Sequence, residues 1–151
     1  TIEELKEVKH PKDTTAVAAY LFNKCKTYFE YSQSDGFIVK TEVFVKLKIY
    51  KKDGYEWANN QVKFYTGGIQ KERIDFNKAT TYNLVNGAIE KTKLKNEGEF
   101  TEKINKYWDV KKITMPNVKE GSIIEYSYTI SSPYISNLQA WDFQKSIPVN
   151  Y

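Results

Sequence analysis

The stretch FIVKTEVFVKLKIY, residues 37–50, decides the fold class, because its side chains alternate in character along its whole length. A β-strand points successive side chains to opposite faces, so this alternation indicates a strand with one buried face. The positions expected to face the core are Phe37, Val39, Thr41, Val43, Val45, Leu47 and Ile49. The positions expected to face solvent are Ile38, Lys40, Glu42, Phe44, Lys46, Lys48 and Tyr50. Strands usually have about 5–6 residues, so a stretch this long predicts a bulge or bend within it.

The residues before this strand predict a short helix and two shorter strands. Thr1 and Glu4 have capping-box spacing, which predicts a helix over residues 1–9 that Pro11 ends. The apolar stripe expected on that helix is Ile2, Leu5 and Val8. Residues 17–22 and 25–31 alternate like strands, with Asn23-Lys24 as a turn between them and a second turn at 34–36.

The residues after the long strand predict further short strands joined by turns. Asp53-Gly54, Gly67-Gly68 and Asn86-Gly87 are expected turns or breaks, and the last suits a hairpin because Asn and Gly tolerate positive φ. The expected strands are 56–65, 69–76, 78–82, 88–94, 111–115, 122–131 and 139–146. Residues 101–107 are expected to form one or two helical turns, because Phe100, Ile104 and Trp108 are spaced by four. Eight or more strands at short spacing predict an all-β, antiparallel sandwich or barrel in one domain, 1–151.

Composition narrows the classes of partner and compartment. The chain has 151 residues and a net charge of +4, and its lysines are spread along strands rather than clustered. Arg73 is the sole arginine, so no nucleic-acid footprint is expected. Apolar runs are too short for a membrane span, and one cysteine allows no internal disulfide. Because the chain starts at Thr1 without a signal peptide, we expect a processed or excised part of a larger protein.

The residues that support catalysis or metal binding are sparse, which predicts a non-enzyme without cofactor or metal. Cys25 lies in an alternating stretch and is interpreted as a buried core residue, and His10 precedes a proline and is interpreted as a surface residue. Carboxylates that could in principle act together are Glu125, Asp142 and Asp109. Glu125 is expected instead to pair with a lysine or hydroxyl of a neighbouring strand.

The three tryptophans are candidates for a binding surface. Trp57, Trp108 and Trp141 could stack on sugar rings or hold a peptide if their faces are exposed. Trp141 shares a strand face with Phe143, so core packing is the preferred interpretation there, whereas Trp57 and Trp108 lie nearer turns. Buried indoles would each need a hydrogen-bond partner.

Three motifs resemble a known family. Residues 81–87 read TYNLVNG, residues 115–128 read MPNVKEGSIIEYSY, and residues 141–149 read WDFQKSIPV. Together they resemble the domain of unknown function 3857, which is found on the N-terminal side of transglutaminase-like domains in bacterial cell-envelope proteins. The positions that carry the signature are Pro116, Gly121, Glu125, Tyr126, Trp141, Phe143, Gln144 and Pro148.

The resemblance implies an immunoglobulin-like β-sandwich that follows a secretion signal, in the periplasm or outside the cell. Catalysis in such proteins belongs to a separate, papain-like domain downstream, so the resemblance implies a non-catalytic accessory or protein-interaction module. Its expected partners are that downstream domain in the same chain and, beyond it, a protein, peptide or glycan of the envelope. The alternative is a carbohydrate-binding sandwich, motivated by the tyrosine and tryptophan content. A hydrolase built on Glu125 and Asp142 is the least supported hypothesis.

Overall fold

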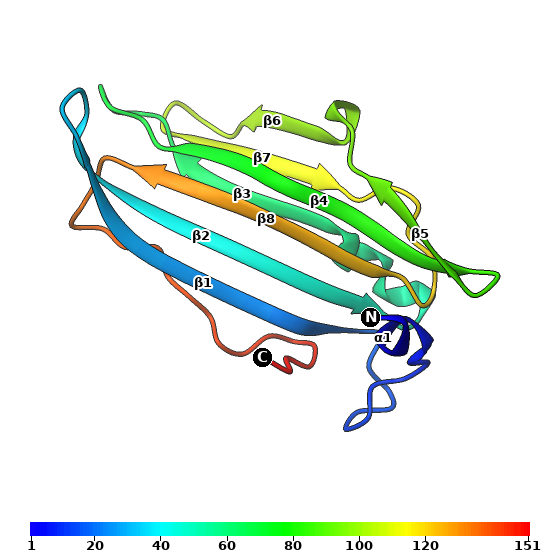
Figure 1. Ribbon diagram of the computed structural model, residues 1–151. Coiled ribbons are helices and arrows are strands. Elements are labelled where there is room, and N and C mark those ends of the chain that lie inside the picture. The colour runs from blue at the N-terminus through cyan, green and yellow to red at the C-terminus, as the bar shows by residue number, and fades with distance from the viewer.

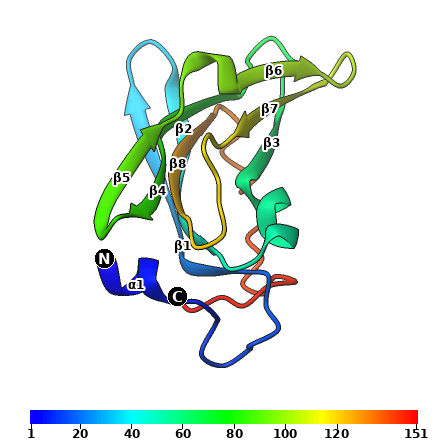
Figure 2. The ribbon, with the colours of Figure 1, turned by 90° about the vertical axis from the view of Figure 1, so that its right-hand side faces the viewer.

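The computed structural model describes residues 1–151 and consists of two antiparallel sheets that face each other (Figures 1 and 2). The larger sheet has five strands in the order β1-β2-β8-β4-β5, and the smaller has three in the order β3-β7-β6. The strands are β1 (Ala18–Ser32), β2 (Gly36–Ile49), β3 (Asn59–Tyr65), β4 (Arg73–Val85), β5 (Ala88–Lys93), β6 (Glu99–Lys103), β7 (Trp108–Thr114) and β8 (Ile123–Ser132). This confirms the all-β, antiparallel sandwich. No helix is long and apolar enough to cross a membrane.

Strand β2 follows the predicted alternation and supplies much of the core. Its core-facing side chains from Val39 to Ile49 are at most 5% exposed, whereas Phe37 at its start is 59% exposed. The main cluster lies between the sheets, because Val45 and Leu47 of the larger sheet share it with Ile113 of the smaller one. The strand predicted at 122–131 is confirmed as β8, and its residues Ile124 and Ile130 are buried.

The bulge expected in the long strand lies in its neighbour instead. β2 pairs with β8 without a break, but the register of β1 shifts between Tyr20 and Phe22. The turn predicted at Asn23-Lys24 is wrong, because these residues pair with Val45 and Phe44 inside one continuous strand. A weak local turn signal cannot compete with the hydrogen bonds that a long neighbouring strand offers.

Strand β4 also joins segments that the sequence predicted as separate. The strand expected at 69–76 begins only at Arg73 and continues through 78–82 as one strand, with a register shift between Phe76 and Lys78. The hairpin to β5 is confirmed, and Asn86 (φ 51°) and Gly87 (φ 80°) supply the two positive φ angles of its turn.

Three local predictions are wrong. Residues 101–107 are not helical but form β6 and a turn in which Ile104 and Asn105 both donate to the Trp108 carbonyl. The strand predicted at 56–65 begins only at Asn59, because a 3-10 helix, η1 (Lys52–Ala58), replaces the expected Asp53-Gly54 turn. Residues 139–146 form no strand, and the C-terminal segment pairs with the sheet only farther along, where Val149 bridges to Tyr20 in parallel.

The N-terminal helix is real but shorter than predicted. Helix α1 covers Ile2–Lys6, and its capping box between Thr1 and Glu4 is present. Leu5 is buried, but Ile2 and Val8 are exposed, so the expected stripe reduces to one residue. The helix lies on the outer side of the larger sheet, near one end (Figure 2).

Gly54 provides a test of the packing at the start of η1. A Cβ at Gly54 would collide with the Val17 carbonyl, which cannot move freely because the amides of Tyr50 (2.9 Å) and Lys51 (3.1 Å) both donate to it. We expect Gly54→Ala to lower the free energy of unfolding by about 2 kcal/mol, as overpacking usually does. Gly36→Asn is the control, because Gly36 has φ +71° with open space around it and Asn tolerates that conformation. Urea unfolding of both variants measures this, and equal midpoints would contradict it.

Candidate functional site

The single cysteine and the single histidine of the chain are both used by the fold. Cys25 is half-buried against the main cluster, and burial raises the pKa of its thiol. The interpretation of His10 as a surface residue is wrong, because its side chain is only 3% exposed. Nδ1 of His10 accepts from the Asp13 amide (3.1 Å), and Nε2 meets Oδ1 of Asn150 at 2.9 Å. His10 thus ties the N-terminal loop to the C-terminal segment, and neither ring nitrogen is left for Cys25.

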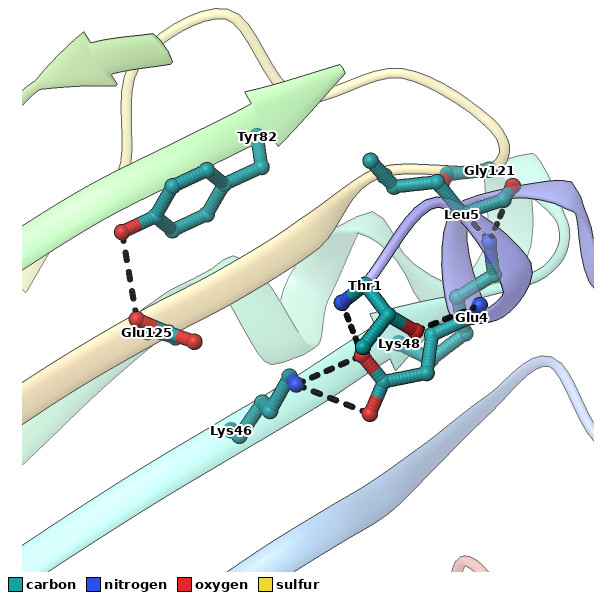
Figure 3. Close-up of polar contacts among 8 residues, drawn as sticks. All are labelled: Thr1, Glu4, Leu5, Lys46, Lys48, Tyr82, Gly121 and Glu125. Atoms are coloured by element: carbon teal, nitrogen blue, oxygen red, sulfur yellow. Dashed lines mark hydrogen bonds and ion pairs between the residues drawn. The ribbon is translucent and has the colours of Figure 1, made fainter. Parts of the chain in front are cut away.

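The three candidate carboxylates lie in separate environments. Glu125 is on the outer side of the larger sheet, where the Tyr82 hydroxyl of neighbouring β4 donates to it at 3.1 Å (Figure 3). Lys78 of the same strand also lies 3.1 Å from it, so Glu125 pairs with a lysine and a hydroxyl as the sequence predicted. Its carboxylate raises the pKa of Lys78. Asp142 is exposed and faces Lys145 at 3.7 Å. Asp109 lines a cleft elsewhere, with a buried Oδ1 that has no hydrogen-bond partner. The fold therefore does not assemble them into one site.

Lys48 is a buried amine whose position the sequence pattern missed. Alternation placed it on a solvated face, but it has no exposed surface because α1 covers it. Its Nζ donates to the carbonyls of Leu5 (2.9 Å) and Gly121 (2.7 Å), as Figure 3 shows. Burial lowers the pKa of Lys48 to about 8. Perturbed groups often mark active sites, but this ammonium contacts backbone on both sides and works as a clamp.

Two neighbours of Lys48 complete the attachment of α1. Lys46 binds both carboxylate oxygens of Glu4, at 2.8 and 2.7 Å, and the Tyr50 hydroxyl donates to Glu7. Burial by itself would raise the pKa of Glu4. The contacts with Lys46 and the N-terminal ammonium outweigh burial and lower that pKa to about 2. The attachment is thus a set of ion pairs and hydrogen bonds between the helix region and the end of β2.

The family-like signature residues mostly support the fold. Gly121 has φ 87°, and its carbonyl accepts from Lys48. Tyr126 is buried in the core, and Pro148 accepts a hydrogen bond from the Tyr20 amide at 2.8 Å. Pro116 is half-buried and follows Met115, the first residue after β7. Phe143 and Gln144 are exposed, which contradicts the predicted strand face shared by Trp141 and Phe143.

The three tryptophans do not form one surface. Trp57 in η1 is half-buried and meets Tyr20 edge-to-face, with ring centroids 6.1 Å apart. Trp141 is half-buried against the same main cluster. Trp108 lies at the other end of β3, paired with Tyr65, and is 41% exposed. A shared sugar-stacking platform of all three is therefore not present.

An exposed aromatic surface, which we call the hairpin patch, occupies the tip of the β1–β2 hairpin. It consists of Phe29, Tyr31 and Phe37, which are 59%, 63% and 59% exposed. These residues follow the core-facing positions Val39 and Thr41 in register, so the patch continues the core face beyond the part that is covered. The rings of Tyr31 and Phe37 lie 5.0 Å apart. Alternation predicted a buried position for Phe37, and only the extent of the smaller sheet decides otherwise.

A polar cleft of about 830 Å³ is a further candidate site. Glu72 in its wall is 5% exposed and accepts a hydrogen bond from the Tyr65 amide at 2.7 Å. The charged side chains around it are Asp35, Lys40, Lys71, Glu72, Arg73, Asp75, Lys103, Lys106 and Asp109. Both signs are interspersed, so the cleft shows no preference for one charge of ligand.

Lys48 provides a test of the clamp through the pH dependence of stability. Its pKa is about 8 in the folded protein against 10.5 unfolded, so between these values the unfolded chain binds more protons and stability rises with pH. We expect Lys48 to raise the free energy of unfolding by about 1 kcal/mol per pH unit between about pH 8 and 9.5. Subtracting the urea stability curve of Lys48→Met from that of the native protein isolates the slope. Lys63→Met on an exposed strand position is the control and should keep it; a Lys48→Met variant with an unchanged slope contradicts the assignment.

Comparisons with known proteins place the fold in a family. The model of a family described as a domain of unknown function with a solved structure, domain of unknown function 3857, matches residues 39–151. No curated protein matches the chain significantly. A crystal structure from Parabacteroides distasonis, provisionally described as a protease, has a TM-score of 0.59 at 11% identity over 77% of this chain. The chain spans only 23% of the length of that protein. Because the family model covers most of the sequence, the chain belongs to the family of the domain of unknown function 3857.

Proposed function

We propose that the chain is a non-catalytic module that binds a protein partner within a secreted, transglutaminase-like protein of the bacterial cell envelope. The partner is a papain-like domain farther along the same polypeptide, and the compartment is the periplasm or the cell exterior. The observation that carries the proposal is the hairpin patch, a group of three aromatic side chains left more than half exposed at the tip of an otherwise well-packed sandwich.

The energetics of the patch favour a protein partner. Fully burying a large apolar side chain stabilises by about 1.5–3 kcal/mol relative to leaving it exposed. Exposed apolar patches of this kind usually mark interaction sites, and aromatic residues are enriched at interface centres. The C-terminal segment, which passes beneath β1 in Figure 1, adds further exposed apolar residues. These are Ile135, Leu138 and Phe143.

The comparisons support a longer protein in which binding and catalysis belong to separate domains. The solved relative is about four times as long as the matched region, so a fold of this kind occurs there as one part of a longer protein. The protease description belongs to that whole protein. In the proposal, the catalytic residues lie outside the present chain, whose Cys25 and His10 are committed to packing and to loop attachment.

A carbohydrate-binding module is the second candidate, and the polar cleft favours it. A volume of about 830 Å³ suits a small saccharide, and Asp109 offers a buried acceptor without a partner. The separation of Trp57, Trp141 and Trp108 removes the stacking platform that motivated this candidate. Titration with envelope glycans, monitored by the fluorescence of Trp108 near the cleft end, tests it, and a shift lost in Asp109→Asn would favour it over protein binding.

The hairpin patch provides the test of the main proposal in the full-length protein. Hydroxyl-radical footprinting should oxidise Phe29, Tyr31 and Phe37 several-fold more slowly than their exposure in the isolated module implies, because the partner domain covers them. The fully exposed Ile69 is the internal reference. The triple variant Phe29→Ser, Tyr31→Ser, Phe37→Ser should uncouple the thermal unfolding of the two domains.

The matched control uses the opposite end of the molecule. Val85 and Ile89, 37% and 39% exposed, flank the β4–β5 turn, far from the β1–β2 tip (Figure 1). The variant Val85→Ser, Ile89→Ser should leave domain coupling unchanged. Full oxidation of the patch together with unchanged coupling in the triple variant would remove the proposal.

A further inference from the structure

Strand β1 is an outer strand of the five-stranded sheet, and most of its outer edge has no partner. In an antiparallel pair, residues alternate between bonding their neighbour and pointing their amide and carbonyl away. The Asn23 amide points away from β2, because it donates to the Tyr151 carbonyl. By alternation the same holds for Cys25, Thr27, Phe29 and Tyr31. We call Lys24–Ser32 the open edge.

The C-terminal segment has already begun to fill this edge. The Tyr20 amide donates to the Pro148 carbonyl and the Asn150 amide donates to the Tyr20 carbonyl, both at 2.8 Å. The Asn23 amide then donates to Tyr151 at 2.6 Å. The bridge between Tyr20 and Val149 is parallel, so the backbone at Tyr151 runs along β1 towards the open edge. A ladder started in this way continues at little entropic cost, because no loop has to be closed.

Side chains along the open edge define what would lie beside it. On the core-facing side stand Phe29 and Tyr31, both mostly exposed. On the outer side Lys24 and Lys26 are exposed and form no ion pair, whereas Glu30 is paired with Lys40 at 2.6 Å. A strand with apolar side chains on one face and at least one carboxylate on the other therefore complements this edge.

We propose that the open edge is completed by an extended segment that runs parallel to β1, and that this segment is the stretch of the longer protein directly following Tyr151. The inference rests on the proposed function, since it takes the chain to be part of a longer polypeptide, and it specifies how the two parts are joined. The segment adds a sixth strand to the larger sheet and covers the edge side of Phe29 and Tyr31. Its length matches Lys24–Ser32, and its carboxylate pairs with Lys24 or Lys26.

Amide hydrogen exchange on the full-length protein tests this strand residue by residue. The outward amides of Cys25, Thr27, Phe29 and Tyr31 should exchange at least tenfold more slowly than those of the 33–35 turn. The inward amides of Lys26 and Tyr28, which bond β2, are protected in every case and serve as the internal control. Proline at alternate positions of the segment that follows Tyr151 should abolish the outward protection and leave the inward protection intact.

Charge variants test the chemistry of the segment. Lys24→Glu with Lys26→Glu should reduce the outward protection several-fold, and Lys9→Glu with Lys12→Glu, with the same change in charge, should not. Outward amides that exchange as fast as the turn in the native protein overturn the proposal. Protection that depends on protein concentration also overturns it, because a second copy would then fill the edge. Footprinting of the hairpin patch reports on side chains, whereas hydrogen exchange reports on backbone amides. The added strand can therefore be refuted while the protein-binding function stands, and the protein-binding function can be refuted while the added strand stands.

Discussion

The burial of one face of β2 is the constraint on which the rest of the structure depends. This strand lies between β1 and β8 for nearly its whole length. Its core-facing side chains share one cluster with Ile113 of β7, in the smaller sheet, and with Met115, which follows that strand. Alternating side chains fix the register, because a slip of one residue would expose the whole apolar set. The bulges in β1 and β4 keep that register where the neighbouring strands would otherwise drift.

Both chain ends are attached to this central sheet by polar groups in unusual places. Lys48 holds α1 by the Leu5 carbonyl and the loop before β8 by the Gly121 carbonyl, and His10 holds the N-terminal loop to Asn150. A buried ammonium is costly unless hydrogen-bonded, and here the fall in its pKa measures that cost. Removing one partner would leave buried groups unsatisfied, which makes these attachments specific as well as stabilising.

The surfaces proposed for binding arise from a mismatch in size between the two sheets. The β1–β2 hairpin extends beyond the smaller sheet, so aromatic residues that continue the core pattern reach solvent as the hairpin patch. The same hairpin carries the open edge beside it. Face and edge together form one corner of the molecule that has apolar side chains and unpaired peptide groups, which is the combination that strand addition and domain docking use.

The sequence by itself determined the strands whose side chains alternate cleanly, the Asn86-Gly87 turn and the Thr1–Glu4 cap. These features depend on neighbours in the chain or on a strong period. Only the tertiary structure decided that β1 and β4 run on through apparent breaks, that residues 101–107 are not helical, and that Lys48 and His10 are buried. It also decided that Phe37 is exposed. Each of these outcomes depends on which distant element lies alongside, and a strand partner or a covering helix leaves no periodic signal in the residues it covers.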